Sequence, residues 1–221
     1  MAQQKNSQNP RLKITEIFYS LQGEAKNVGL PTVFIRLTGC PLRCDYCDTA
    51  YAFSGGEWID IENIVEKVQQ FNTSHITVTG GEPLAQKDCA LLLTKLCDKG
   101  YEVSLETSGA ILVDNVDARV VKVLDVKTPA SKEEAKNKFE NFSHLSKQDQ
   151  VKFVICDQQD YQWSKALIEQ YSLNKKCEIL FSPAHDQLAA VTLANWVLED
   201  QLDVRFQIQL HKYLWGDKKG V

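Results

Sequence analysis

Three cysteines in one short segment constrain this chain more than any other feature. Cys40, Cys44 and Cys47 form the pattern C-x3-C-x2-C directly after an apolar run that ends at Thr38 and Gly39. On a loop, this spacing lets three sulfurs converge on one centre. A [4Fe–4S] cluster fully held by protein needs four thiolates, and no fourth cysteine is near. The pattern therefore predicts a cluster with one iron left open to a cofactor or substrate.

Two simpler interpretations compete with the cluster. The thiols could bind zinc together with His75 or Cys89, as a non-catalytic metal module, or they could be unconnected. Zinc sites usually pair their ligands in two C-x2-C-like groups, and a second group is absent. The cluster is therefore favoured. The other cysteines, which lie in apolar runs, are expected to be buried free thiols: Cys89, Cys97, Cys156 and Cys177.

Charge and apolar content exclude several classes of protein. A formal charge of -4 with no dense Lys/Arg tract gives no electrostatic case for nucleic acid. No stretch approaches the roughly 20 apolar residues that span a bilayer. The polar start, MAQQKNSQNP, lacks the apolar core of a secretion signal, and with seven cysteines it indicates a reducing cytoplasm. We expect a flexible tail over 1–10 and a single domain over 11–221.

Short β-branched or aromatic runs alternate with segments of helical period. This order predicts an α/β fold with a mainly parallel sheet and right-handed crossovers. The helices are too few for eight β/α units, so a reduced or partial barrel fits better than a closed one. Asp60 is expected to cap the first helix, Gly100 to end the second, and 131–148 is left undecided between helix and loop. The predicted strands cover 13–20, 32–38, 75–80, 101–107, 119–126, 151–156, 177–182 and 204–210, and the helices begin at Ile61 and cover about 84–98, 158–171 and 186–199.

The cysteine segment resembles that of the radical S-adenosylmethionine (SAM) superfamily. Tyr46, the aromatic residue before the last cysteine, and the sequence TGGEP at 79–83 carry this resemblance. Two glycines at the carboxyl end of a strand let the backbone approach a ligand closely. The resemblance implies a partial barrel of the radical SAM type, with SAM bound at Gly81 and Tyr46.

Longer motifs resemble one family within this superfamily, the 7-carboxy-7-deazaguanine synthases. The resemblance implies an enzyme of queuosine or 7-deazapurine biosynthesis that converts 6-carboxy-5,6,7,8-tetrahydropterin to 7-carboxy-7-deazaguanine with loss of ammonia. It also implies a flavodoxin- or ferredoxin-type electron donor and a homodimer. The motifs are EIFYSLQGE (16–24), GLPTVFIRLTGC (29–40), CDYCDT (44–49), TGGEP (79–83), ETSG (106–109), LDVKTP (124–129), FSPAH (181–185) and QLHKYLWG (209–216).

The same resemblance assigns roles to individual positions. Thr49 is expected to bind Mg2+, an ion that prefers oxygen ligands, and Asp48 is a competing ligand. Arg36 is expected to face the pterin carboxylate, which a guanidinium can bind through two hydrogen bonds. The further substrate residues are Leu21, Gln22, Gly23, Thr79 and His211, and the further SAM residues are Asp125, Val126, Lys127, Ser182, Pro183, Ala184 and His185.

A glycyl-radical-enzyme activase is the nearest alternative enzyme. Such activases share the C-x3-C-x2-C pattern and a small size, but they act on a protein backbone rather than on a pterin. The LQGE segment, the CDT after the cysteines and the HKYLW terminus favour the pterin enzyme.

Overall fold

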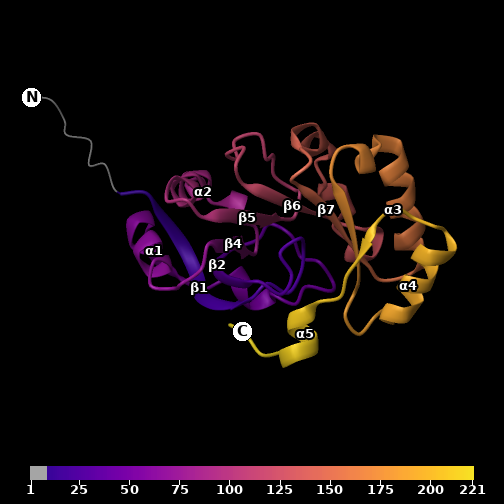
Figure 1. Cartoon of the computed structure of the whole chain (residues 1–221), viewed down its shortest axis with the longest axis horizontal. Helices are drawn as coiled ribbons and strands as arrows, with labels where there is room; N and C mark the ends of the chain where they lie inside the picture. Colours follow the sequence, from indigo (N-terminus) through magenta and orange to yellow (C-terminus); the bar gives the residue numbers. More distant parts are fainter. Residues whose placement is uncertain (1–8) are drawn as a thin grey trace, which may run out of the picture.

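The computed structural model describes residues 9–221 and contains one nine-stranded sheet. Seven strands are parallel, while the first strand pairs antiparallel with both of its neighbours. The sheet order, β3-β1-β2-β4-β5-β6-β7-β8-β9, leaves two free edges, so the barrel is open as predicted (Figure 1). Most of the predicted tail, 1–8, lies outside the described residues. The strands are β1 (Arg11–Leu21), β2 (Pro31–Leu37), β3 (Glu57–Asp60), β4 (His75–Gly80), β5 (Glu102–Thr107), β6 (Val121–Val126), β7 (Gln150–Ile155), β8 (Glu178–Pro183) and β9 (Arg205–Phe206).

Four α-helices cover the outer face of the sheet, and a fifth lies on the inner side (Figure 1). Within the described chain, no α-helix connects β5 to β6 or β6 to β7, which explains why the sequence shows too few helical segments for a full barrel. None of the helices in the described part of the chain is long and apolar enough to span a bilayer. The helices are α1 (Ile61–Val68), α2 (Cys89–Asp98), α3 (Gln158–Tyr171), α4 (Ala190–Glu199) and α5 (Leu210–Trp215).

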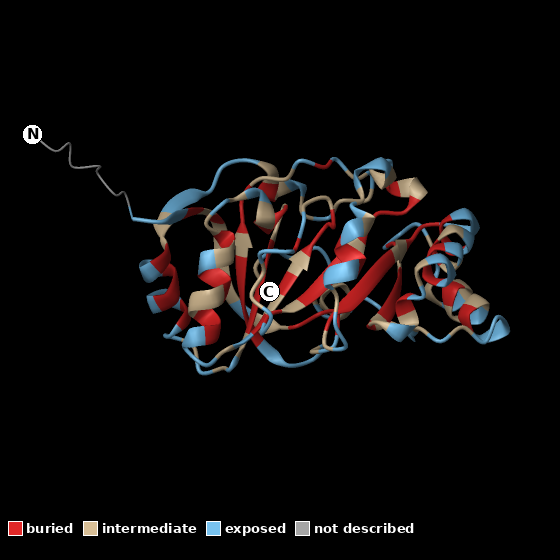
Figure 2. Ribbon diagram, turned by 90° about the horizontal axis from the view of Figure 1, so that it is seen from above, coloured by how far each residue is buried: buried red, intermediate tan, exposed pale blue. Residues whose placement is uncertain are grey.

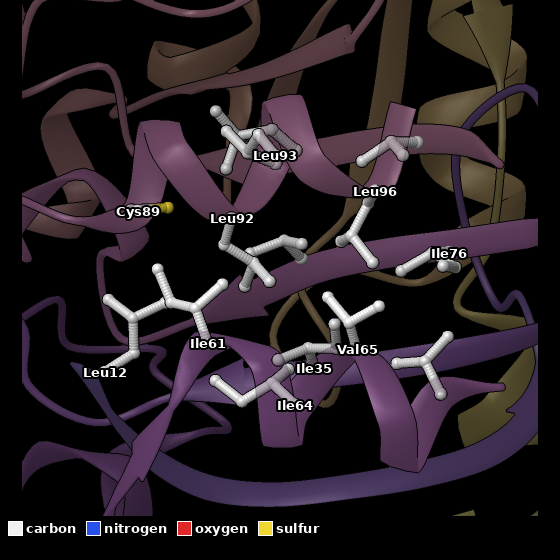
Figure 3. Packing of buried hydrophobic residues seen from close by; sticks show 14 of the residues in the cluster. Leu12, Ile35, Ile61, Ile64, Val65, Ile76, Cys89, Leu92, Leu93 and Leu96 are labelled. Carbon is white, nitrogen blue, oxygen red and sulfur yellow. The ribbon is translucent and has the colours of Figure 1, made fainter. Parts of the chain in front are cut away.

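The two faces of the sheet differ because strand side chains alternate between them. The outer face is apolar and packs under the helices, whose buried sides face the sheet (Figure 2). In the first half of the sheet, Ile35 and Ile76 pack in one cluster with Ile64 of α1 and Leu92 of α2 (Figure 3). The inner face carries buried polar side chains. These side chains line a cavity, so within the described chain the inner face does not pack against a second layer of helices.

Several predicted boundaries were wrong, because contacts far along the chain interrupt the local pattern. The helix predicted over 84–98 is a short turn at Pro83–Ala85 followed by α2, since the Gln86 side chain bonds to Lys13 on β1 and holds its own backbone extended. The helix predicted from 186 begins at Ala190, because Asp186 has a left-handed φ of 61°. Gly100 ends α2 as predicted, with φ at 87°.

Three further expectations were also changed by the structure. Asp60 occupies the N-cap position of α1 but makes no capping hydrogen bond, and its carboxylate lies 3.1 Å from Nε of Arg11. The strand predicted over 204–210 is only Arg205–Phe206, and helix α5 follows. The undecided stretch 131–148 is neither one helix nor a free loop: three short 3-10 turns cover 129–131, 134–136 and 139–144.

Candidate active site

A cavity of about 550 Å3 lies on the inner side of the sheet. Its floor is made by the carboxyl ends of the parallel strands, where ligands bind in open α/β sheets. The cysteine loop, 40–49, forms one wall, and the segment 209–221 with α5 forms another. The cavity therefore brings together residues from nearly the whole length of the chain.

The three clustered cysteines all line this cavity, and none is fully buried. Burial raises the pKa of Cys44 to about 11, and the neighbouring Cys47 and Cys40 add to the rise. Burial raises the pKa of Cys40 and Cys47 as well. The three thiols thus lie close enough to influence one another, on one wall of one cavity.

This arrangement does not fit a single zinc ion. Within residues 9–221, no three His, Cys, Asp or Glu side chains are grouped as one metal ion requires. The two residues considered as additional zinc ligands are elsewhere: His75 begins β4, at the opposite end from the cavity, and Cys89 is fully buried in the first turn of α2. A larger cluster, whose corners keep its thiolate ligands apart, fits three thiols spread along one loop.

The glycine-rich segment after β4 packs tightly against the start of the cysteine loop. A Cβ atom on Gly81 would lie 2.2 Å from the carbonyl oxygen of Gly39 and 2.8 Å from Cβ of Cys40, so only glycine fits there. The next residue, Glu82, is fully buried and accepts hydrogen bonds from the Thr107 hydroxyl at 2.9 Å and the Ser108 amide at 2.7 Å. The predicted SAM motif is thus fixed between two strand ends.

Buried charges form a layer on the cavity floor. Nζ of Lys152 lies 2.8 Å from Oε2 of Glu24 and 3.4 Å from Oδ2 of Asp125, and Nζ of Lys127 lies 3.0 Å from Oδ1 of Asp125. Burial opposes ionisation, but the carboxylates of Glu24 and Asp125 hold the pKa of Lys152 well above its usual value. Lys127 and Lys152 in turn outweigh burial and lower the pKa of Asp125. Lys152 and Asp125 are therefore both charged at neutral pH.

The predicted substrate residues meet at the other side of the floor. Arg36 lies beside Thr79 in the register of β2 and β4, and the Thr79 hydroxyl donates to Oε2 of Glu106 at 3.3 Å. A Cβ atom on Gly23 would lie 2.1 Å from Nδ1 of His211, so a glycine is needed for that ring to pack there. Burial lowers the pKa of His211 and favours its neutral form.

The LQGE segment presents one free acceptor to the cavity. Nε2 of Gln22 donates to the Thr77 hydroxyl at 2.9 Å, and Oε1 of Gln22 accepts the amide of Glu24 at 3.3 Å. Oε1 of Glu24 is buried and has no hydrogen-bond partner among the described residues. A buried carboxylate oxygen without a partner is costly, so a ligand donor is expected there.

Thr49 and Asp48 lie together at the cavity wall. The Thr49 hydroxyl donates to Oδ1 of Asp48 at 2.7 Å, and Nε2 of Gln209 donates to Oδ2 at 3.3 Å. Burial opposes the ionisation of Asp48, but the Thr49 hydrogen bond and the charge of Lys152 outweigh it and lower its pKa. Two oxygen groups at the cavity wall are of the kind that Mg2+ prefers as ligands.

Most of the residues predicted for the site line the cavity, including Tyr46, Leu21, Ala184 and His185. Three do not: the Val126 side chain packs in the outer core, and Ser182 and Pro183 lie outside the lining. The cavity also contains side chains for which the sequence predicted no role: Phe18, Glu24, Phe34, Tyr51, Glu106, Lys152 and Lys219. For Phe18, Glu24, Phe34 and Glu106 the available signal was their place in the quoted motifs, and for Lys152 it was alternation on β7. Tyr51 and Lys219 lie off the strands and carried neither signal.

Comparison with known proteins identifies the family and the fold. Residues 34–125 match the model of the radical SAM superfamily. The chain is 43% identical to the 7-carboxy-7-deazaguanine synthase of Chlorobaculum tepidum, over 95% of this chain and 97% of that protein. It is 42% identical to the synthase of Koribacter versatilis, over 95% of this chain and all of that protein. The crystal structure of QueE from Escherichia coli superposes with a TM-score of 0.76 at 22% identity, covering 91% of this chain and 95% of that one.

Proposed function

The chain belongs to the 7-carboxy-7-deazaguanine synthases, which are radical SAM enzymes of queuosine biosynthesis, and we propose that its cavity performs their reaction. The substrate is 6-carboxy-5,6,7,8-tetrahydropterin, and the products are 7-carboxy-7-deazaguanine and ammonia. The observation that carries this proposal is that Cys40, Cys44 and Cys47 and the family's pterin motif open into one cavity.

Cys40, Cys44 and Cys47 would hold the [4Fe–4S] cluster, and three thiolates leave one corner for SAM. When bound, the cluster and SAM supply the one-electron chemistry that removes a hydrogen atom from the pterin. Gly81, beside the cysteine loop, and Tyr46, within it, would bind SAM. The buried Tyr46 hydroxyl has no hydrogen-bond partner among residues 9–221, so it is available to a ligand. Lys127 and Asp125 would bind its polar groups from the end of β6.

Arg36 would bind the pterin carboxylate, because its guanidinium lines the cavity and carries the planar pair of donors that a carboxylate requires. Glu24 would accept from the ring nitrogens through its free Oε1, and Thr79 and His211 would fix the ring from either side. Phe18 and Phe34 stack at 4.9 Å between ring centroids and line the same space, so they would exclude water from a bound pterin.

Mg2+ would bind through Thr49, with Asp48 beside it and the substrate carboxylate as a further ligand. Oxygen ligands and an incomplete protein shell are typical of Mg2+ sites. Thr49 and Asp48 would hold the ion, which would supply positive charge to the substrate carboxylate.

The enzyme would need an electron donor, a defined oligomeric state and a compartment in the cell. A small flavodoxin- or ferredoxin-type protein would supply the electron, since enzymes of this superfamily need a reductant. We propose a single domain over 11–221, a homodimer as the working form and the cytoplasm as the compartment.

The test is an assay of anaerobically purified and reconstituted protein with 6-carboxytetrahydropterin, SAM, Mg2+ and a reductant. The expected result is brown protein with about four irons per chain and formation of the deazaguanine, both lost in Cys44→Ala. A colourless protein holding one zinc would contradict the cluster. Cleavage of SAM without the deazaguanine product would contradict the substrate and favour a glycyl-radical activase.

A further inference from the structure

The segment 128–133, which follows β6, touches the cysteine loop at the residues on either side of Cys44. The backbone amide of Arg43 donates to Oε1 of Glu133 at 2.5 Å. The backbone amide of Asp45 donates to the carbonyl oxygen of Ser131 at 3.3 Å, and the Asp45 carboxylate pairs with Lys132. Both amides that flank the middle cysteine are therefore held by one short stretch of chain.

This stretch is itself firmly anchored in the core. Asp160, fully buried in the first turn of α3, accepts the Thr128 hydroxyl at 3.0 Å and the Ala130 amide at 2.9 Å. The Ser131 hydroxyl donates to the carbonyl of Thr128 at 2.6 Å and accepts the amide of Glu133 at 3.1 Å. None of the three residues Thr128, Ser131 and Asp160 has exposed surface. The segment 128–133 is therefore fixed to α3, and its hydrogen bonds to Arg43 and Asp45 fix the cysteine loop in turn.

Lys132, a residue in a strained backbone conformation, precedes Glu133 and turns the chain so that the Glu133 carboxylate reaches the cysteine loop. Lys132 has φ at 61° and ψ at 14°, a left-handed conformation that non-glycine residues rarely adopt. Such a conformation persists only where the surroundings determine it. Here it reverses the chain between Ser131, which holds Asp45, and Glu133, which holds Arg43.

The cysteine loop has few hydrogen bonds of its own. Within it, the Cys47 amide donates to the Cys44 carbonyl at 3.1 Å and the Leu42 amide to Sγ of Cys40 at 3.4 Å. The Arg43 side chain adds bonds to the Cys40 and Leu42 carbonyls and lies over the Phe53 ring at 4.2 Å. The far end of the loop is held by the bonds of Thr49 and Gln209 to Asp48, but around Cys44 the hydrogen bonds to the rest of the described chain are those to 128–133.

We propose that the segment 128–133 is a clamp that holds the cysteine loop in its cluster-binding shape before any cluster is present, with Glu133 as the positioning residue. The inference rests on the proposed cluster site. Ordering the ligands in advance lowers the entropy that cluster binding must remove, as in other preorganised sites. Glu133 acts through the backbone of Arg43 and touches neither cluster nor substrate.

Hydrogen exchange of the cluster-free protein tests the clamp directly. In Glu133→Ala, exchange of the Arg43 amide is expected to rise about tenfold, because its hydrogen bond to a charged group is lost. Exchange of the Asp45 amide, whose acceptor is the Ser131 carbonyl, should rise by a smaller factor as the turn loosens. Glu133→Gln should restore most of the protection, since its amide oxygen also accepts. Glu134→Ala is the matched control, because the side chain of Glu134 makes no hydrogen bond or ion pair within residues 9–221, and wild-type exchange is expected.

A second measurement links the clamp to the cluster. Anaerobic reconstitution of Glu133→Ala is expected to be several-fold slower, with the thermal midpoint unchanged relative to Glu134→Ala. Equal exchange in the two variants would overturn the clamp. A wild-type protein that takes up no iron would contradict the proposed function instead, while the exchange result would still decide whether 128–133 holds the loop.

Discussion

Arg36 and Glu16 form a half-buried ion pair in which Nε of the guanidinium lies 2.7 Å from Oε1 of the carboxylate. The two residues are directly opposite in the antiparallel register of β1 and β2. The same carboxylate oxygen accepts the Tyr51 hydroxyl at 2.7 Å. Glu16 therefore fixes Arg36 through Nε, and the terminal nitrogens have no hydrogen-bond partner among the described residues, which leaves them for a substrate carboxylate.

Glu16→Gln is expected to raise KM for the carboxypterin about tenfold while changing kcat little. The guanidinium loses its charged partner and its fixed orientation, and a hydrogen bond to a charged group contributes about 1.5–3 kcal/mol. Steady-state kinetics measure the effect, with Glu66→Gln on the exposed side of α1 as the control. A fall in kcat at unchanged KM would assign Glu16 to a different step.

Lys152→Met is expected to lower the free energy of unfolding by about 3–5 kcal/mol. Glu24 and Asp125 would remain buried on the cavity floor without their shared cation. Denaturant unfolding of the cluster-free protein measures this loss.

Lys165→Met is the control for that prediction. Lys165 pairs with Asp200 near the surface of α3, and such a pair contributes about 0–1 kcal/mol. Similar losses in the two variants would mean that the buried layer contributes no more than a surface ion pair.

Much of this architecture could be predicted from the sequence. The apolar runs identified eight of the nine strands, and the cysteine spacing and TGGEP marked two segments that line the cavity, the cysteine loop and the end of β4. These features are local, because the apolar pattern of a strand and the spacing of metal-ligating cysteines can both be recognised within a few residues.

The buried charges could not be predicted, because their partners are far apart in the chain. Lys152 stands in the strand QVKFVI, where a lysine is ordinarily solvated, and its partner Glu24 belongs to the other end of the sheet. The predicted end of the last strand, residue 210, was wrong for the same reason, since β9 ends at Phe206. Gln207 accepts the amide of Ala25 at 2.9 Å, and Leu210 donates to the carbonyl of Gly23 at 3.0 Å, which draws the chain off the sheet and into α5.

Glu106→Gln is expected to change how stability depends on pH. Burial raises the pKa of Glu106, with Glu24 and Asp125 adding to the rise and Lys152 and Arg36 opposing it. The unfolded side chain titrates near 4.5, so above that pH the folded state holds more protons than the unfolded state. The free energy of unfolding therefore falls as pH rises between the two pKa values.

In Glu106→Gln this loss is absent, so the variant should gain stability relative to wild type as pH rises above about 4.5 and level off above the folded pKa. Urea unfolding of the cluster-free proteins between about pH 4 and pH 8 measures the difference. Parallel curves over that range would show that Glu106 ionises equally in both states.

Thr49→Val is expected to raise the Mg2+ concentration for half-maximal activity by at least about threefold. Mg2+ takes few protein ligands, so removing one hydroxyl weakens a large share of the protein's contribution. Thr192→Val, on α4 away from the cavity, is the control. Identical Mg2+ titrations for wild type and Thr49→Val would remove Thr49 from the metal site.

Gly81→Ala is expected to prevent cluster binding, because the added Cβ atom would clash with the start of the cysteine loop. The new Cβ would lie 2.2 Å from the Gly39 carbonyl oxygen and 2.8 Å from Cβ of Cys40, closer than such atoms approach. The start of the cysteine loop must then move, and overpacking of this kind costs about 1–3 kcal/mol. Iron content after anaerobic reconstitution measures the outcome, and most of the four irons should be lost.

Gly100→Ala separates that clash from general destabilisation. Gly100 has φ at 87°, and a Cβ atom added there would meet no other atom within 4 Å, so alanine is strained but clashes with nothing. A left-handed alanine costs about 1–3 kcal/mol, similar to the cost at Gly81. Gly100→Ala should therefore lose stability and keep its iron, because the strain lies at the end of α2. If both variants kept their iron, the contact between Gly81 and Cys40 would have no part in shaping the cluster site.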